Sequence, residues 1–383
     1  MTKALIAGYP WDLLDDLDAT LDRLRGDVGA TGVAVWAAAR PVLTLRAREA
    51  EPRVFRTRGG LLFHPSPEHL EGTRIKPIVS EWAKGRTVWP RIAEACAARG
   101  LELRAIVSAA ATGRLAERNP EAASKNLFGT VSERSLCLCN ADVQAFVCGL
   151  VADLTSREGV AGSVLTDVHV SWDEARRDAV ETALPTDGVQ QTLLGMCFCE
   201  SCYQKAAAEE VDAAAARRVA QKILNDSLEH GNGRAERIEV LVGDQPILAA
   251  YQRAQTLELS RLVGRLGEAC SGELILERSL DGPMRRQHDA IDWSVPAASL
   301  TSLNPDTALS TALSAAARRR ELRLPASWAL GPNAQELVKT VAQAVEAGCD
   351  GLLFDHLGLL PDRGLNTVRQ ALRFARRSGG APV

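Results

Sequence analysis

The feature that most constrains the fold is an alternation of short apolar runs with amphipathic segments along the chain. Runs such as VAVW, LRAIVS and GLLF are almost continuously hydrophobic, as in parallel strands that are covered on both faces. We predict eight such strands, at residues 4–7, 32–36, 102–107, 163–169, 273–277, 299–303, 323–328 and 351–356. Helical periodicity lies between most of them, at residues 13–24, 91–99, 141–155, 335–347 and 365–376.

Eight strands with helices between them predict an α/β fold of the (β/α)8 TIM-barrel type. A doubly wound open sheet shows the same alternation and is the competing arrangement. The sequence contains no internal repeat, low-complexity tract or convincing linker. We therefore expect residues 1–383 to form a single barrel domain.

Two long connections interrupt the regular alternation. Residues 40–90 follow the second predicted strand, and RVFRTRGGLLFHP within them suggests a hairpin that turns at Gly59 and Gly60. Residues 171–194 follow the fourth predicted strand and lead into a helical extension at 203–270. In a TIM barrel such loops open at the C-terminal face, where active sites lie.

The charge and hydropathy of the chain argue against several kinds of partner. A formal net charge of -3 leaves no basic footprint for nucleic acid, and no polybasic cluster suggests a membrane surface. No run approaches the roughly 18 apolar residues of a membrane span. The apolar stretch in the opening MTKALIAGYP is too short for a signal-peptide core. We expect a cytoplasmic protein without nucleic-acid or membrane partners.

Carboxylates at the ends of predicted strands are the first candidates for chemistry, because barrel loops surround the substrate there. Asp167 lies in SVLTDVHV, Glu277 in ELILERSLDG and Asp355 in GLLFDHLG. Hydrolysis of a glycosidic bond needs two carboxyl groups that flank the scissile bond. Asp167 and Glu277, on neighbouring strands, are the predicted catalytic pair, with Asp355 as a substitute. The structural alternative is that each carboxylate caps a helix or pairs with an arginine, such as Arg278.

Histidine and tryptophan residues near the same strand ends are the predicted substrate-binding groups. His169 and His356 would bond to sugar hydroxyls or adjust the pKa of a carboxyl group. Indole rings can stack on sugar rings, although many pack only in the core. The tryptophans concerned are Trp11, Trp36, Trp172 and Trp328.

The nine cysteines indicate free thiols or a metal site, because their number is odd and the chain shows no secretion signal. Cys137 and Cys139 form a C-x-C motif, and Cys197, Cys199 and Cys202 form C-x-C-x-x-C. Closely spaced thiolates suit a tetrahedral structural zinc ion, which these five residues are predicted to bind. The alternative is that they are compact buried side chains. No organic cofactor is predicted.

Three longer segments carry a resemblance to a known family. SLCLCNADVQAFVCGLVADL, GVAGSVLTDVH and LLGMCFCESCYQKA look like segments of bacterial glycoside-hydrolase-like (β/α)8-barrel proteins of the alanine-rich, glycosidase-like type. GGLLFHP, RIKPIVSE and EAGCDGLLFDHLGLL extend the similarity over most of the chain in the same order. The resemblance implies a glycosidase-type barrel.

The chain departs from that family at polar positions. Relatives carry a Tyr-His pair after the second strand, where this chain has Ala37 and Ala38, and His-Asn near Ala111 and Thr112. The family's acidic residue in the fourth strand is expected to align with Thr166 rather than Asp167. These losses imply either a less polar substrate or a loss of catalysis.

The sequence therefore predicts a glycoside-hydrolase-like hydrolase that cleaves a glycosidic bond of a carbohydrate or small glycoside with a carboxylate pair. A non-catalytic barrel that binds a carbohydrate or a protein partner is one alternative. A metal-dependent isomerase or lyase is another, in which His169, Glu277 and His356 would hold the metal.

Overall fold

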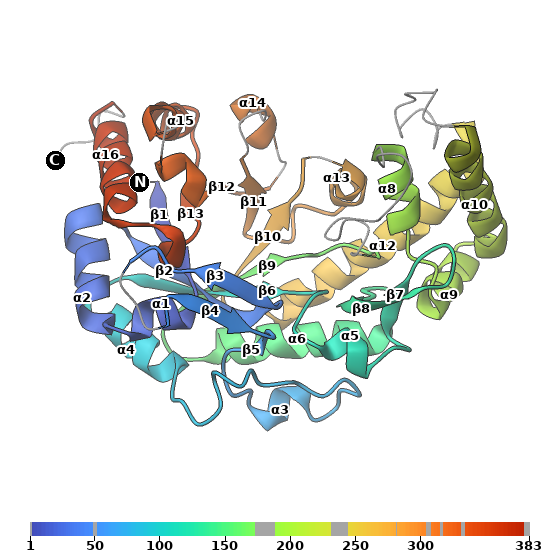
Figure 1. The fold of residues 1–383 in the computed structure, drawn as a ribbon, viewed down its shortest axis with the longest axis horizontal. Helices are drawn as coiled ribbons and strands as arrows, with labels where there is room; N and C mark the ends of the chain where they lie inside the picture. Colours follow the sequence, from blue (N-terminus) through green and yellow to red (C-terminus); the bar gives the residue numbers. More distant parts are fainter. Residues whose placement is uncertain are drawn as a thin grey trace.

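The chain forms a closed barrel of eight parallel strands (Figure 1). The computed structural model describes residues 2–48, 52–172, 188–230, 244–280, 282–303, 308–314, 317–330 and 334–378. The barrel strands are β1 (Lys3–Gly8), β2 (Gly32–Ala39), β6 (Glu102–Ser108), β9 (Val160–Thr166), β10 (Glu273–Arg278), β11 (Ala298–Ser302), β12 (Arg320–Leu324) and β13 (Gly351–Phe354). Because β1 pairs with both β2 and β13, the sheet closes on itself. The predicted barrel is confirmed, and the open sheet is excluded.

Two strands end at least three residues earlier than the sequence predicts, and β11 and β13 end one and two residues earlier, at Ser302 and Phe354. The strand predicted at 163–169 is β9, which ends at Thr166 because Asp167 has a left-handed backbone with φ of 56°. The strand predicted at 323–328 is β12, which ends at Leu324. Pro325 has no N–H for the strand ladder, and the 3-10 helix η2 (Ala326–Ala329) follows it. Trp328 therefore lies on a helical turn rather than on a strand.

The barrel strands are apolar on both sides because two core layers use alternate residues. Leu5 and Ala7 belong to a cluster inside the barrel, whereas Ala4 and Ile6 belong to a larger cluster beneath the helices. The interior cluster also contains Ala34, Trp36, Ile106, Val164, Ile275, Leu300 and Leu353. This division explains the nearly continuous hydrophobic runs of the sequence.

The N-terminal end of the barrel is closed by charged side chains. The Arg104 side chain is buried, and its guanidinium contacts Glu321 at 2.6 Å, Glu102 at 2.5 Å and Glu273 at 3.4 Å. Lys3 lies 2.7 Å from Glu102, which adds a second cation. Burial disfavours the charge of Arg104, but the carboxylates of Glu321 and Glu102 outweigh it and raise its pKa.

Helices surround the barrel, and the extension predicted at 203–270 is helical over most of its described residues, 203–230 and 244–270, whereas 231–243 lie outside the described part of the chain. Three of its helices lie together on one side of the barrel, at the right of Figure 1: α9 (Glu200–Ala208), α10 (Ala213–His230) and α12 (Pro246–Ala269). The other helices are α1 (Pro10–Leu14), α2 (Leu17–Asp22), the π-helix η1 (Arg23–Val28), α3 (Pro67–Leu70), α4 (Trp89–Ala98), α5 (Leu115–Arg118), α6 (Ala141–Ser156), α8 (Gly188–Gly195), α13 (Gly282–Asp289), α14 (Leu309–Ala312), α15 (Ala334–Glu346), the 3-10 helix η4 (Leu357–Leu359) and α16 (Asp362–Ser378).

The long connection after β2 contains a hairpin, but its turn does not lie at the two glycines. The hairpin pairs β3 (Val42–Leu45) with β4 (Val54–Thr57) in antiparallel register. Gly59 and Gly60 instead lead into β5 (Gly60–Leu61), which pairs with β2. A Cβ at Gly59 would lie 2.4 Å from the Ala39 carbonyl oxygen, so this close approach requires glycine. A second hairpin pairs β7 (Ala123–Lys125) with β8 (Val131–Leu136).

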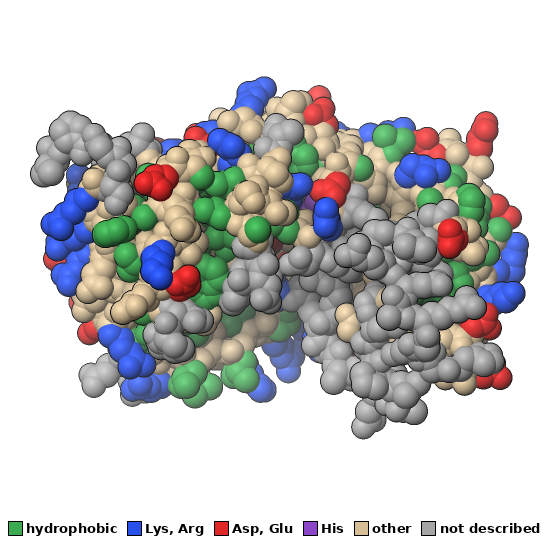
Figure 2. All heavy atoms as spheres, turned by 90° about the horizontal axis from the view of Figure 1, so that it is seen from above, with side chains coloured by type: hydrophobic (Ala, Val, Ile, Leu, Met, Phe, Trp, Pro, Cys, Tyr) green, Lys and Arg blue, Asp and Glu red, His purple; other side chains and the backbone are tan. Residues whose placement is uncertain are grey.

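The surface carries both signs of charge. On the face seen in Figure 2, Lys and Arg side chains are interspersed with Asp and Glu side chains over the described residues. Among the described residues, no helix combines the length and apolar character that crossing a bilayer requires.

Candidate functional site

The three predicted carboxylates lie at the C-terminal mouth of the barrel, at or just beyond the ends of their strands. Asp167 follows β9, Glu277 is the penultimate residue of β10 and Asp355 follows β13. The Ser108 hydroxyl, at the end of β6, donates a 2.6 Å hydrogen bond to Asp167 Oδ2. Arg40 lies 3.5 Å from the same oxygen. Asp167 is therefore held between a hydroxyl group and a guanidinium.

Arg323 of β12 joins the other two carboxylates. Its guanidinium donates to Glu277 Oε1 at 2.9 Å and to Asp355 Oδ2 at 2.7 and 3.1 Å. The Ser302 hydroxyl donates a further hydrogen bond to Glu277 at 3.1 Å. Burial disfavours the charge of Arg323, yet the nearby carboxylates of Asp355 and Glu277 outweigh it and raise its pKa. Arg323 is not among the predicted site residues, because the sequence pattern predicts it at the start of a strand, whereas it lies near the end of β12.

The other side of the mouth contains a buried network around His356. Asp12, on α1, accepts the backbone N–H of Tyr9 at 3.1 Å and lies 3.8 Å from His356 Nδ1. Its other oxygen lies 3.4 Å from Arg46 Nε. Burial raises the pKa of Asp12, although His356, the Tyr9 N–H and Arg46 all favour its ionised form. Asp12 is thus a buried acid beside the predicted site.

An aromatic stack lies against this network. The Tyr9 ring stacks on Trp36 and Trp11 at centroid distances of 5.7 and 4.5 Å, and its edge meets His356 at 5.3 Å. Phe55 of the β3–β4 hairpin stacks on Trp11 at 4.3 Å. Trp11 is consequently covered by protein rings from Tyr9 and Phe55, whereas Tyr9 connects the stack to the mouth.

The remaining predicted binding residues are spread along the rim and in the core. His169 is buried three residues beyond β9, with Nδ1 2.8 Å from the Ser171 hydroxyl. Trp172 is half-buried and donates its backbone N–H to Gly195. Trp328 belongs to the outer hydrophobic core. A role for these side chains in substrate binding remains a prediction.

His288, on α13, is buried beneath this rim, and the sequence did not predict it as a site residue. Its Nδ1 accepts the Ser279 N–H at 2.8 Å, and its Nε2 lies 2.9 Å from the Val168 carbonyl. The ring is therefore assigned as the neutral tautomer with its proton on Nε2. Burial lowers the pKa of His288, so the neutral form is favoured.

Alanines occupy the positions where the resembled family has polar residues. Ala37 and Ala38 are fully buried near the end of β2, and Ala111 is 4% exposed after β6. The Thr112 hydroxyl is bonded to the Ser108 carbonyl at 2.5 Å. This part of the rim is consequently packed with small apolar groups.

Four cysteines form a group that could hold a metal ion. The Sγ atoms of Cys137, Cys197, Cys199 and Cys202 all lie within 4.8 Å of one another, and all four residues are buried. Cys137 follows β8, while the other three precede or begin α9. Cys139, which was predicted as a fifth ligand, is not part of this group.

The surroundings of the thiols also suit a metal centre. Neighbouring thiols, Cys137 foremost, lower the pKa of Cys199, whereas burial raises the pKa of Cys197 and Cys202. Tyr251 and Gln255 of α12 both donate to the Cys197 carbonyl, at 2.7 and 2.8 Å, and so position the C-x-C-x-x-C loop. Within the described part of the chain, His169, Glu277 and His356 do not form a comparable metal-binding group.

Comparisons with known proteins support the fold at low sequence identity. No family model and no curated protein matches the sequence. The fold is similar to α-L-fucosidase isoenzyme 2 from Paenibacillus thiaminolyticus, with 12% identity, a TM-score of 0.57 and coverage of 98% of this chain and 49% of that chain. The PgaB (BpsB) glycoside hydrolase domain from Bordetella bronchiseptica is matched over 100% of both chains, with 13% identity and a TM-score of 0.53.

A β-galactosidase from the psychrophilic Marinomonas ef1 is matched over 97% of this chain and 59% of that chain, with 9% identity and a TM-score of 0.55. The chain thus spans about half the length of the fucosidase and somewhat more of the galactosidase. These likenesses show that the chain has a TIM-barrel fold.

Proposed function

We propose that the chain is a glycoside-hydrolase-like enzyme that cleaves a glycosidic bond at the C-terminal mouth of its barrel. The observation that carries this proposal is the gathering of Asp167, Glu277 and Asp355 at this mouth, each held by a hydroxyl or guanidinium group. Paired carboxyl groups are the usual catalytic apparatus of such enzymes. The structural neighbours, which are glycosidases by name, are consistent with this chemistry.

We assign the two catalytic roles from the partners of each carboxylate. Glu277 contacts the Arg323 guanidinium at 2.9 Å, which holds this carboxylate in place, and we assign it the role of the nucleophile or of the base that activates water. Asp167 accepts a hydrogen bond from the Ser108 hydroxyl and lies 3.5 Å from Arg40, and we assign it the protonation of the leaving oxygen. Asp355 shares Arg323 with Glu277 and helps to hold the guanidinium in place.

His356 and His169 are proposed to bond to sugar hydroxyls around these carboxylates. We further propose that the group formed by Cys137, Cys197, Cys199 and Cys202 binds a structural zinc ion. Four buried thiol ligands match a closed tetrahedral site, in which no position is left for a substrate. The zinc would join the loop after β8 to the start of α9 and would stabilise the fold.

A non-catalytic carbohydrate-binding barrel is the second candidate function. The observation that favours it is the packing of Ala37, Ala38 and Ala111 where the resembled family has polar groups. An ion pair such as Glu277–Arg323 can also be purely structural. Binding without turnover would then be the whole activity.

The two functions are distinguished by turnover of a panel of aryl glycosides and oligosaccharides. For the enzyme, Asp167→Asn and Glu277→Gln should each reduce kcat by at least about 100-fold, because an acid or base is removed with little change of shape. Asp212→Asn, at an exposed carboxylate beside α10, is the matched control and should retain full activity. Unfolding midpoints of all variants should stay close to that of the wild type.

Absence of wild-type turnover across the panel, with carbohydrate binding retained, would support the non-catalytic function instead. Turnover that survives both substitutions would contradict the assigned pair.

A further inference from the structure

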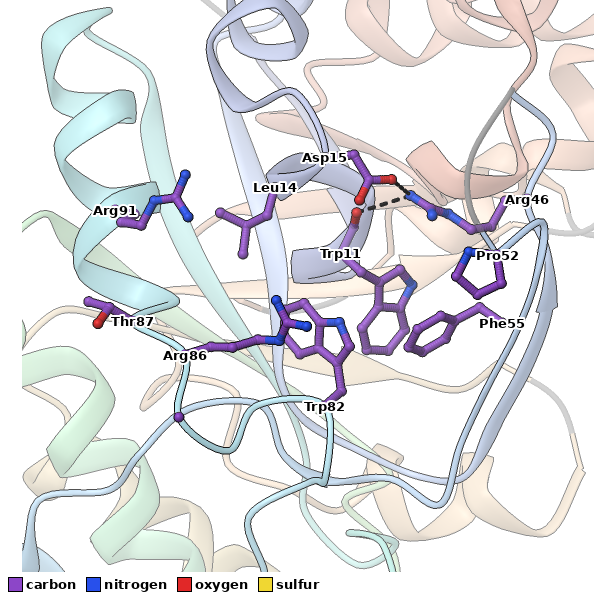
Figure 3. A pocket seen from close by; sticks show the side chains of 11 residues that line it. Trp11, Leu14, Asp15, Arg46, Pro52, Phe55, Trp82, Arg86, Thr87 and Arg91 are labelled. Atoms are coloured by element: carbon purple, nitrogen blue, oxygen red, sulfur yellow. Dashed lines mark hydrogen bonds and ion pairs between the residues drawn. The ribbon is translucent and has the colours of Figure 1, made fainter.

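A pocket of about 560 Å³ lies between the loops that follow β1 and β2, beside the barrel mouth. Its walls come from α1, the β3–β4 hairpin, the loop before α4 and the first turn of α4 (Figure 3). Both loops open at the C-terminal face, as do the proposed catalytic carboxylates. Its volume is within the roughly 300–1,000 Å³ that is typical of small-molecule sites.

The pocket carries positive charge that its own acidic group does not balance. Asp15 is paired with Arg46, so these two lining charges neutralise each other. Arg86 and Arg91 also line the pocket and are exposed. Within the described part of the chain, neither of them forms an ion pair. Two guanidinium groups are therefore available to an anion, and guanidinium binds carboxylate, sulfate or phosphate in a bidentate manner.

The same pocket offers aromatic surface. Phe55 and Trp82 are half-buried at its wall, and the buried Trp11 forms a floor between Tyr9 and Phe55. The guanidinium of Arg86 lies 5.3 Å from the centre of the Trp82 ring, which positions this cation beside an aromatic group. Aromatic faces bind the C–H groups of a sugar ring, while the two arginines require a negative charge on it.

We infer that this pocket binds an acidic sugar residue, that is, a sugar ring that carries a carboxylate, sulfate or phosphate group. The Trp11–Tyr9–Trp36 stack connects its floor to the mouth, where Tyr9 contacts His356. An oligosaccharide bound at the mouth would thus place a neighbouring acidic residue in the pocket. That last step rests on the proposed function, whereas the recognition of an acidic sugar rests on the pocket alone.

Binding is tested with the full chain on an array of uronate, sulfated and phosphorylated oligosaccharides, each beside its neutral counterpart. For uronates the counterpart is the methyl ester, which keeps the ring and removes the charge. Calorimetry on the best ligand should give an affinity at least about tenfold higher for the acidic form. This preference should decrease as the salt concentration rises.

Two variants locate the binding site. Arg86→Gln with Arg91→Gln should abolish the preference for the acidic form and leave the weaker binding of the neutral form unchanged. Arg118→Gln with Arg218→Gln, at exposed arginines outside the pocket, is the matched control and should bind as the wild type does. Trp82→Ala should weaken the binding of both forms.

The outcomes separate this inference from the proposed function. Arginine-dependent binding of an acidic sugar without any turnover supports the pocket and contradicts the proposed enzyme. If glycosides are turned over but no acidic sugar binds through Arg86 and Arg91, the inference about the pocket is contradicted and the proposed enzyme function stands. The inference would be overturned if Trp82→Ala did not change the binding of the acidic sugar and inorganic sulfate bound as tightly as that sugar. The pocket would then be a simple anion site.

Discussion

Replacement of Arg104 by methionine should strongly destabilise the barrel, because it removes the cation at its N-terminal end. Glu321 is 3% exposed, and the Arg104 guanidinium 2.6 Å away is the partner that compensates its charge. The charges of Glu102 and Glu273 remain paired in this variant, because Lys3 lies 2.7 Å from Glu102 and Arg319 lies 2.7 Å from Glu273.

The size of the expected loss of stability follows from Glu321, whose carboxylate is left without a cation. An uncompensated buried charge costs about 3–5 kcal/mol, whereas an exposed or otherwise paired charge costs about 1 kcal/mol or less. We therefore expect Arg104→Met to lower the free energy of unfolding by about 3–5 kcal/mol near pH 8. Glu273→Gln, at a half-exposed carboxylate, should lower it by about 1 kcal/mol or less.

Urea unfolding of the variants between pH 5 and pH 8 measures these differences. The double variant Arg104→Met with Glu321→Met removes both charges and should recover most of the stability.

Two results would refute this reasoning. One is a loss below about 1 kcal/mol for Arg104→Met at pH 8, which would mean that water reaches Glu321. The other is a double variant that is no more stable than the single variant, since the cost would then come from lost packing rather than from an unpaired charge.

Three further predictions concern the metal, pH and backbone packing. Protein purified without added metal should contain about one zinc per chain by elemental analysis, and Cys199→Ser should lose it together with stability. Because burial lowers the pKa of His288, its contribution to stability is complete above its ordinary pKa of about 6.5 and declines as the pH falls below it. In His288→Gln, the free energy of unfolding, measured with urea, should decrease less as the pH falls. Gly162→Ala should cost about 1–3 kcal/mol, because its Cβ would lie 2.3 Å from the Glu273 carbonyl oxygen. Gly264→Ala, in α12 with no atom nearby, is the control and should stabilise by about 0.5–1 kcal/mol.

Each of these three predictions has an outcome that would contradict it. Metal-free wild-type protein whose stability is unaffected by chelators would contradict the zinc site. An unchanged pH profile in His288→Gln would show that another group causes the acid sensitivity. Equal effects of Gly162→Ala and Gly264→Ala on stability would show that a side chain fits between Gly162 of β9 and Glu273 of β10.

The sequence by itself determined the kind of fold. Strands that are buried on both faces are apolar at most positions, so their runs could be counted, and eight runs predicted the barrel that is observed. Local chemistry was also readable, because a closely spaced cysteine motif depends on neighbours in the sequence. Cys197, Cys199 and Cys202 do share one group.

The tertiary structure decided which groups meet. Cys137 joins the metal group and Cys139 does not, although both belong to one C-x-C motif. Arg323 of β12 reaches Asp355 at the end of the neighbouring strand β13 and Glu277 on β10, which lies beyond β11. The sequence placed the ends of two strands wrongly by several residues, so it did not predict this meeting. The physical reason is that strand register, side-chain direction and charge pairing depend on contacts between residues far apart in the chain. Such contacts leave no periodic pattern in the sequence.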